Sequence, residues 1–156
     1  MTYCPLFHVG ILVPDMAEAM KRFSEVLDLD FMDPVRGHVA DLQEGDRVQP
    51  WDVYLTYSKQ GPPHIELIEA AGEGAYGLHH GAGLHHIGAW CPDVKERIAE
   101  LGNLQVGAET IFRNGDDIFG AFFQPAALFG TRYEISPASV EESWRNWLNG
   151  GPSYMD

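Results

Sequence analysis

Residues 7–23 read FHVGILVPDMAEAMKRF, and residues 85–101 read HHIGAWCPDVKERIAEL. The two stretches align without a gap, His8 against His86, at a constant offset of 78 residues. In each copy an apolar, strand-like run ends at a Pro-Asp pair, whose aspartate is suited to cap a helix. The chain is therefore a tandem duplication, and each copy begins with a strand that is followed by a helix.

Each predicted helix presents one apolar face. The apolar positions recur at i, i+4 and i+7, a spacing that places them on one side of a helix and indicates packing against a sheet. They are Met16, Met20 and Phe23 in the first copy and Val94, Ile98 and Leu101 in the second.

Three more strand-like runs follow each helix, separated by turn sequences such as SKQGPP and RNGDD. Each half therefore has the order β-α-β-β-β. A helix covers one face of such a sheet, so the two halves can curl toward each other to cover the other face. We predict an α+β fold, in which two tandem β-α-β-β-β modules form a curved, barrel-like mixed sheet with a metal-binding cleft. The runs lie at about 31–42, 51–57 and 64–70, and at about 106–113, 118–125 and 131–137.

We expect one domain over residues 1–156. A short C-terminal helix should begin at a capping box formed by Ser139 and Glu142, and should pack its apolar stripe onto the body of the chain. The final GGPSYMD is expected to be frayed. The expected segments are module one at about 5–70, a Gly-rich linker near the cleft mouth at 71–84, module two at about 85–137 and the C-terminal helix at about 139–149.

The composition excludes several classes of partner. The formal net charge is −13, so the phosphate backbone of a nucleic acid would be repelled. No stretch approaches the roughly 18 apolar residues of a membrane span, and the first residues do not resemble a signal peptide. We expect a cytoplasmic protein that binds neither nucleic acid nor membrane. Cys4 and Cys91 are too few for a disulfide framework and are expected to be reduced thiols.

Alternation along the first strand of each copy places one histidine in the cleft. The odd-numbered residues from Phe7 to Val13 are apolar and should face the helix, so His8 points the other way. The repeat puts His86 at the equivalent position. His85 falls on the opposite face from His86 and is expected to look outward, under the second helix.

The last strand of each copy places one glutamate in the same cleft, Glu66 from HIELIE and Glu134 from RYEIS. Two buried carboxylates need compensating cations. No Lys or Arg is repeated at this level, whereas one divalent ion balances two carboxylates and also binds neutral imidazole. A hydrogen-bonded structural network is the alternative. We predict that His8, Glu66, His86 and Glu134 hold one divalent metal ion, with Zn, Ni, Co, Mn and Mg as candidates.

The motifs HVGILVPDM, HIELIE, GAGLHHIGAWCPDV and RYEIS resemble the vicinal oxygen chelate superfamily over about residues 7–137. This superfamily includes glyoxalase I, methylmalonyl-CoA epimerase, extradiol dioxygenases and fosfomycin-resistance proteins. The resemblance implies paired β-α-β-β-β modules, a small-molecule substrate and a homodimer. It also implies a metal held by first-strand and last-strand residues, which fall on His8, Glu66, His86 and Glu134. The ligand order is like bacterial glyoxalase I, while GAGLHHIGAW is closer to the epimerases.

The resemblance and the ligand set together indicate a metal-dependent isomerase or epimerase. A substrate that chelates the ion through vicinal oxygens, with an acyl-CoA among the candidates, would lose a proton α to its carbonyl. By resemblance Glu134 is the expected catalytic base. The second acid/base glutamate of the epimerases has no counterpart, because Val48 stands at its place with Glu44 and Asp46 only nearby.

Three alternatives stay open at this point. A lyase like glyoxalase I would act on a thiol adduct, and a metal-free protein of the same fold would bind a small molecule such as a drug. An extradiol dioxygenase would use two histidines and one glutamate around Fe(II), so Glu66 as a fourth ligand argues against it.

Two further residues are candidates for contact with the substrate. Arg132 shares a face with Glu134 and could pair with a substrate anion, and His64 shares a face with Glu66 and could line the cleft. The remaining candidates, which are equally typical of ordinary surface positions, are Arg36, Arg47 and Arg113 and the linker histidines His79 and His80.

Overall fold

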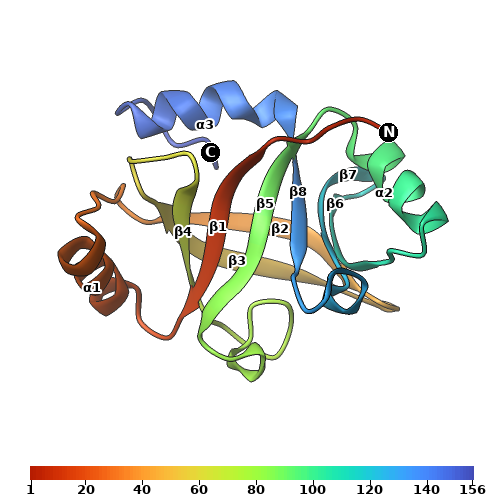
Figure 1. Cartoon of the computed structure of the whole chain (residues 1–156), viewed down its shortest axis with the longest axis horizontal. Helices are drawn as coiled ribbons and strands as arrows, with labels where there is room; N and C mark the ends of the chain where they lie inside the picture. Colours follow the sequence, from red (N-terminus) through yellow and green to blue (C-terminus); the bar gives the residue numbers. More distant parts are fainter.

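The computed structural model describes all residues, 1–156, and its strands close into one barrel (Figure 1). The strand order around the barrel is β1-β4-β3-β2-β6-β7-β8-β5, with both parallel and antiparallel neighbours. The predicted α+β fold with a mixed, barrel-like sheet is confirmed. The elements are β1 (Leu6–Val13), α1 (Met16–Leu27), β2 (Val35–Glu44), β3 (Arg47–Tyr57), β4 (His64–Glu69), β5 (Gly83–Cys91), α2 (Val94–Asn103), β6 (Ala108–Asn114), β7 (Asp117–Phe123), β8 (Tyr133–Pro137) and α3 (Glu141–Leu148).

The two modules have the same internal pairing and meet at two seams. In each module the first strand lies parallel to the last, as β1 does to β4 and β5 to β8. The seams between modules are antiparallel: β1 pairs with β5, and β2 pairs with β6. The barrel is therefore closed only by pairing between modules.

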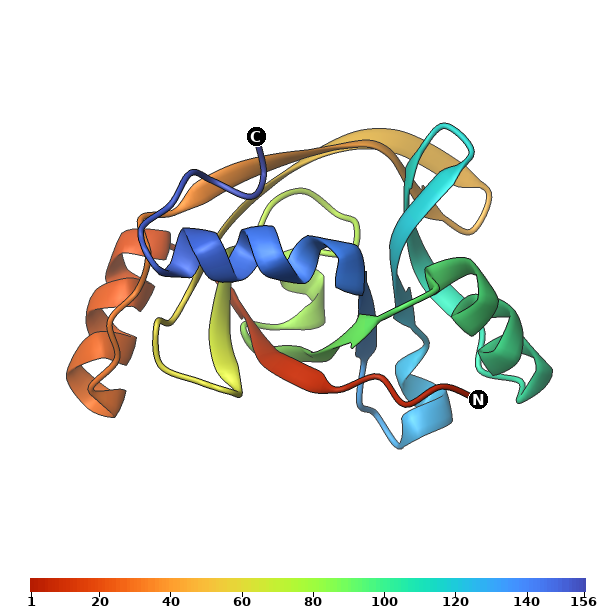
Figure 2. The same cartoon turned by 90° about the horizontal axis from the view of Figure 1, so that it is seen from above.

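Both long helices begin where the repeat predicts. The side chains of Asp15 and Asp93 accept hydrogen bonds of 2.8 Å from the backbone N–H groups of Glu18 and Glu96. The helices lie on the outside of the barrel, α1 beside β4 and α2 beside β7 and β8 (Figure 2). All residues of the predicted apolar faces pack in the hydrophobic clusters between these helices and the barrel. They are Met16, Met20 and Phe23 of α1 and Val94, Ile98 and Leu101 of α2.

The predicted orientation of Phe7 is wrong. Phe7 does not face a helix with Ile11 and Val13 but stacks on Trp90, with ring centroids 3.7 Å apart, in the main core. The register between β1 and β5 shifts between Leu6 and His8, so the strict alternation assumed for this strand fails at its first residues.

The C-terminal segment also differs from the prediction. The capping box does not form, because α3 begins at Glu141 and its N-cap, Val140, makes no side-chain hydrogen bond. Trp144 and Trp147 are buried against the chain's own core, as expected. The final residues are not frayed, since Tyr154 folds back and packs on Trp147. Tyr154 and Met155 pack against the main core and line the cavity inside the barrel.

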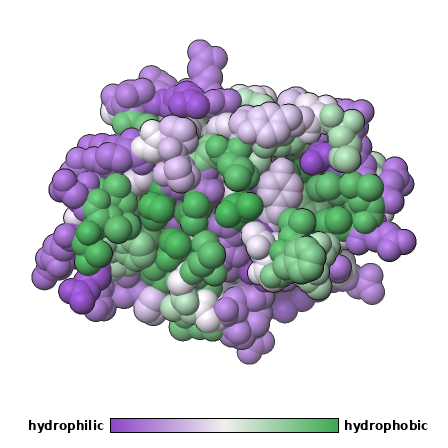
Figure 3. All heavy atoms as spheres, in the orientation of Figure 1, coloured by the Kyte–Doolittle hydropathy of each residue, from purple (hydrophilic) through white to green (hydrophobic).

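Apolar side chains also gather on the face of β1 and β5 that neither α1 nor α2 covers (Figure 3). Leu6 on β1 and Leu84 on β5 are exposed. None of the helices has the length and apolar character needed to cross a bilayer.

Candidate metal centre

Four polar side chains from four neighbouring strands converge inside the barrel. His8 on β1, Glu66 on β4, His86 on β5 and Glu134 on β8 bring one nitrogen or oxygen atom each to within 4.8 Å of one another. The two Nε2 atoms are 2.8 Å apart. Each Nε2 lies 2.9–3.3 Å from Oε2 of both glutamates. The structure thus brings together all four residues that the sequence selected.

Two glycines make room for the histidine rings. In the register of β1 and β5, His8 lies opposite Gly88, and Gly10 lies opposite His86. A Cβ added at Gly88 would stand 1.9 Å from Cε1 of His8, and one added at Gly10 would stand 2.0 Å from Cε1 of His86. Each imidazole therefore crosses directly over the glycine of the opposite strand.

The spacing and chemistry of the cluster fit one divalent ion. Neighbouring ligands of an octahedral ion with bonds of about 2.1 Å lie about 3 Å apart, which matches the nitrogen–oxygen separations of 2.9–3.3 Å. The Oε2 atom of Glu66 is buried, and its only polar neighbours are the two histidine Nε2 atoms, neither of which forms a well-aligned hydrogen bond to it. Imidazole and carboxylate groups together suit Zn, Ni, Co or Mn. These residues could hold such an ion.

The electrostatics of the cluster also call for a cation. Burial lowers the pKa of His8, but the charges of Glu66 and Glu134 outweigh burial and raise it to about 9. Burial raises the pKa of Glu134, but His86 and His8 outweigh this effect and lower it to about 2. The pKa of Glu66 is also lowered by the histidines, against the effect of burial. Both carboxylates are therefore anionic at neutral pH.

The two carboxylates differ in their other partners. The hydroxyl of Tyr57, which lies opposite Glu66 in the register of β3 and β4, donates a hydrogen bond of 2.6 Å to Oε1 of Glu66. Glu134 has polar contacts only with His8 and His86. Glu66 is thus fixed from two sides, whereas Glu134 is fixed from one.

The predicted outward orientation of His85 is wrong. His85 is buried, its Nε2 lies 2.7 Å from the backbone oxygen of Ala75, and its Nδ1 lies 2.9 Å from Nδ1 of His86. The register of β1 and β5 shifts between Gly10 and Ile11, opposite His85, so both histidines turn inward. This contact could not be predicted from the sequence, because a bulge does not change the pattern of apolar and polar residues along the strand.

These contacts determine which nitrogen of His86 is free. The oxygen of Ala75 can only accept, so Nε2 of His85 donates to it. In neutral His85 the Nδ1 atom is then an acceptor, and Nδ1 of His86 must donate to it. Nε2 of His86 is left with its lone pair directed at the centre of the cluster, as a metal ligand requires.

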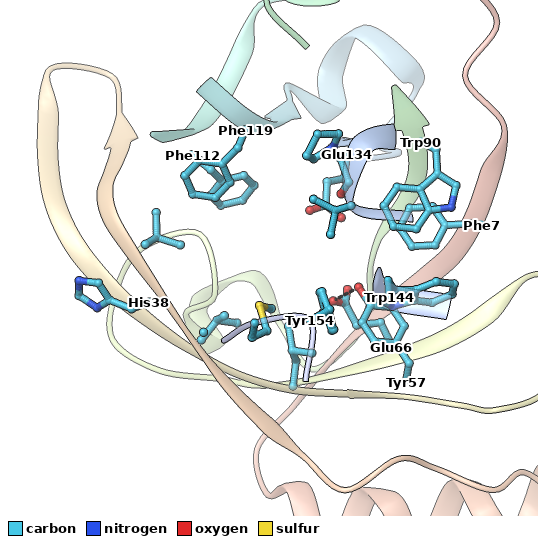
Figure 4. A pocket seen from close by; sticks show the side chains of 18 of the residues that line it. Phe7, His38, Tyr57, Glu66, Trp90, Phe112, Phe119, Glu134, Trp144 and Tyr154 are labelled. Atoms are coloured by element: carbon cyan, nitrogen blue, oxygen red, sulfur yellow. Dashed lines mark hydrogen bonds between the residues drawn. The ribbon is translucent and has the colours of Figure 1, made fainter. Parts of the chain in front are cut away.

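A cavity of about 350 Å³ opens beside the cluster. In Figure 4 the carboxylates of Glu66 and Glu134 point toward one another across it, and the rings of Phe112 and Phe119 lie on the same side as His38. The lining comes from the barrel strands, from α3 and from the C-terminal tail, which contributes Tyr154. Of the four clustered residues Glu66 and Glu134 line this cavity, so a small molecule in it would reach the two carboxylates.

The two residues suggested as substrate contacts are engaged elsewhere. The guanidinium of Arg132 forms an ion pair of 2.7 Å with Glu109, and His64 lies 2.8 Å from the backbone oxygen of Ser58 with its ring against Trp144. Neither residue lines the cavity. His64 lies opposite His8 in the register of β1 and β4, but neither His64 nor Arg132 contributes an atom to the four-residue cluster.

Three tyrosines of the cavity were missed in the sequence. Tyr57 ends the strand WDVYLTY, Tyr76 lies in the Gly-rich linker, and Tyr154 lies in the tail that was expected to be frayed. Burial raises the pKa of each, and the nearby glutamates raise it further, so each hydroxyl is neutral. Of the three, only Tyr57 could have been predicted from the sequence, because a hairpin turn at SKQGPP brings the end of its strand near HIELIE.

A family model supports this architecture. Residues 7–122 match the model described as "Glyoxalase/Bleomycin resistance protein/Dioxygenase superfamily". No curated protein matches the chain significantly.

Solved structures share the fold at low sequence identity. A hypothetical protein from Bacillus halodurans C-125 is 22% identical, with a TM-score of 0.61 over 87% of this chain and 95% of that one. A methylmalonyl-CoA epimerase from Mycobacterium tuberculosis is 19% identical, with a TM-score of 0.60 over 88% and 91% of the two chains. A variant of the Streptomyces coelicolor methylmalonyl-CoA epimerase, in complex with 2-nitronate-propionyl-CoA, is 18% identical, with a TM-score of 0.61 over 88% and 96%. These likenesses concern the fold.

Proposed function

The chain belongs to the glyoxalase/bleomycin resistance protein/dioxygenase superfamily, and from that premise we propose that it is a divalent-metal-dependent isomerase or epimerase. The substrate is a small molecule from which a proton α to a carbonyl is removed. His8, Glu66, His86 and Glu134 are the proposed ligands of one ion. The observation that carries the proposal is the convergence of these four residues, three of them buried and Glu134 partly buried, beside a cavity that could receive a substrate.

Such an ion would act as a Lewis acid, which makes the α-proton of a chelated carbonyl compound more acidic. Glu134 is the proposed base. Its carboxylate lines the cavity and has no partner beyond the two histidines, so it can turn toward a substrate while Tyr57 holds Glu66 in place. A base must reach the proton that it removes, and Glu134 is the less constrained of the two carboxylates.

The cavity favours an isomerase with one base over an epimerase with two. Val48, at the place of the second base of the epimerases, does not line the cavity, and neither do Glu44 and Asp46. Glu66 and Glu134 are the only carboxylates in the lining, and Tyr57 restrains Glu66. A single mobile carboxylate can remove a proton and return it to another atom on the same face of the substrate.

Elemental analysis and solvent-deuterium exchange test the proposal together. The purified protein should contain about one divalent ion per chain, and it should exchange the α-proton of small 2-keto or 2-hydroxy-keto compounds with D₂O. Glu134→Gln should lower exchange by at least 10²-fold, the typical contribution of a positioned base, and should weaken metal binding much less. Glu142→Gln, at an exposed position of α3, is the matched control and should exchange normally.

Each alternative function has its own outcome in the same experiment. Metal without exchange, but with turnover of a thiol adduct, would identify a lyase. A protein that binds small molecules without any metal would be a binding protein. Full exchange by the Glu134→Gln variant would remove Glu134 as the base.

A further inference from the structure

The cavity beside the proposed metal ligands offers no positive charge to a substrate. Of its 19 lining residues, 13 are hydrophobic, and none is lysine or arginine. The basic residue in the lining is His38, whose Nδ1 lies 2.6 Å from a carboxylate oxygen of Asp52 in an exposed pair. An anionic group on a substrate would therefore have no free cationic partner.

The metal would not supply the missing charge. Two carboxylates, Glu66 and Glu134, balance the formal charge of one divalent ion, so the loaded centre has no net positive charge to stabilise an anionic group elsewhere in the cavity. The chain as a whole has a formal net charge of −13. The guanidinium of Arg132, which could have compensated an anion, is paired with Glu109.

The rest of the cavity suits a ring-containing apolar body. Val39, Val53, Phe112 and Phe119 line it, and the rings of Phe112 and Phe119 are stacked with centroids 6.2 Å apart. Figure 4 shows these two rings on one side of the clustered carboxylates and Phe7 with Trp90 on the other. A volume of about 350 Å³ lies within the usual range for small-molecule sites.

We propose that the substrate is an uncharged molecule, with an apolar body of one or two rings and two adjacent oxygen atoms as its only strongly polar group. The adjacent oxygens lie against the clustered side chains, and the body lies against Phe112 and Phe119. The inference rests on the proposed function, since it takes the four clustered residues to be a metal centre. It excludes substrates that place a phosphate or carboxylate inside the cavity, where such a group would have no cationic partner.

Three hydroxamates test the proposal, because they share a chelating head and differ only in the body. Calorimetry on the Zn-loaded protein would measure Kd for acetohydroxamate, benzohydroxamate and 4-carboxybenzohydroxamate. Benzohydroxamate should bind at least tenfold more tightly than acetohydroxamate, because its ring is removed from water. It should also bind at least tenfold more tightly than the carboxylated probe, whose charge would be buried without a partner.

A charge introduced into the lining should reverse the second preference. Phe119 is only half-buried, so Phe119→Lys is expected to fold, and it should bind 4-carboxybenzohydroxamate more tightly than benzohydroxamate. Phe129→Lys adds the same charge at a fully exposed position outside the cavity and should keep the wild-type order. Equal affinities for acetohydroxamate and benzohydroxamate, or tightest binding of the anionic probe by the wild type, would overturn the proposal.

A pair of probes without a chelating head separates this proposal from the proposed function. In protein treated with EDTA, 2-naphthol should alter the fluorescence of Trp90 and Trp144, which line the cavity, and 2-naphthoate should not. If no hydroxamate binds but naphthol is selected over naphthoate, the metal centre is wrong and the substrate class stands. If naphthoate binds as tightly as naphthol, the substrate class is wrong whatever the metal does.

Discussion

His85 sets the direction in which His86 can bind a metal. The ring of His85 donates a hydrogen bond through Nε2 to the backbone oxygen of Ala75 and accepts one through Nδ1 from Nδ1 of His86. His8 has no such support, because its own Nδ1 is buried without a partner. The two proposed histidine ligands are therefore unequal, although the repeat makes them equivalent in sequence.

Removing the hydrogen-bond acceptor at His85 should weaken metal binding. We expect His85→Phe, which keeps a ring in the same space, to raise the metal Kd about 10–100-fold, the usual effect of losing such an outer partner. His85→Asn keeps an acceptor near Nδ1 and should retain most of the affinity. The measurement is a metal titration, with ¹⁵N NMR of His86 reporting which ring nitrogen carries the proton.

The control for this substitution is His79→Phe, at an exposed histidine of the linker. It should leave the metal Kd and the protonated nitrogen of His86 unchanged. A His85→Phe protein with wild-type affinity would show that the connection through His85 only packs the core.

The stability of the metal-free protein should depend on pH through His8. Its pKa is raised from 6.5 to about 9, so its contribution is fully present below pH 6.5 and is lost as the pH rises through 9. The pKa of Glu134 is lowered from 4.5 to about 2, so its contribution is present above pH 4.5 and is lost as the pH falls through 2. The free energy of unfolding should therefore be greatest between pH 4.5 and pH 6.5, where both contributions are present.

Thermal unfolding in EDTA should show a fall in Tm of roughly 5 °C or more between pH 6.5 and 9. The metal-loaded protein should not show it, because the ion replaces the proton on His8. Glu66→Gln removes the largest charge that raises this pKa, so the fall should move to lower pH. A Tm that is constant from pH 6.5 to 9 in EDTA would contradict the assignment.

At the scale of elements, the paired strands β1 and β5 position both histidines of the cluster. Each strand offers one histidine and, two residues later, one glycine that the opposite histidine covers. A glycine is required at these positions for the space above the strand rather than for an unusual backbone angle. The motifs HVG and HIG therefore act together, because the glycine of each motif leaves room for the histidine of the other.

Gly88→Ala should displace the ring of His8. The added Cβ would lie 1.9 Å from Cε1 of that ring, so the ring must move or the strands must separate. We expect substantial loss of bound metal and a loss of stability of about 1–3 kcal/mol, as for other overpacked sites. Elemental analysis and thermal unfolding measure the two effects.

Gly102→Ala is the matched control, because a Cβ on this α2 residue meets no atom within 4 Å. It should keep its metal and gain stability slightly, since alanine favours the helix. Full metal content in Gly88→Ala would mean that metal binding does not depend on the present position of the His8 ring.

The repeat predicts the elements well, and alternation predicts four of the inward-facing residues. It fails at Phe7 and His85, each next to a register shift between β1 and β5. A bulge adds a residue to the strand without changing the apolar pattern of the sequence. A prediction that assumes strict alternation of side chains between the two faces cannot detect it. Tyr154 was missed for another reason: the tail has no periodicity, and its docking depends on a cavity that β2 and β3 help to build.

At the scale of the whole molecule, the four-residue cluster forms only because the barrel closes between modules. His8 and Glu66 come from module one, and His86 and Glu134 come from module two. The seams β1–β5 and β2–β6 hold the halves together, and α3 lies across the barrel near the cavity (Figure 2). Neither module could form the four-residue cluster alone.

We therefore propose that the chain unfolds as one cooperative domain. Leu42→Ala on β2 and Leu101→Ala on α2 remove buried side chains from different modules. Each should cost about 2–5 kcal/mol and lower one common Tm by roughly 5–15 °C, because strand pairing joins both modules in one barrel. Leu104→Ala, at an exposed position, should change Tm little. Tryptophan fluorescence and far-UV circular dichroism should report the same transition in every variant. Two transitions, with each buried variant shifting only one, would mean that the modules are separate folding units and that the centre forms after they dock.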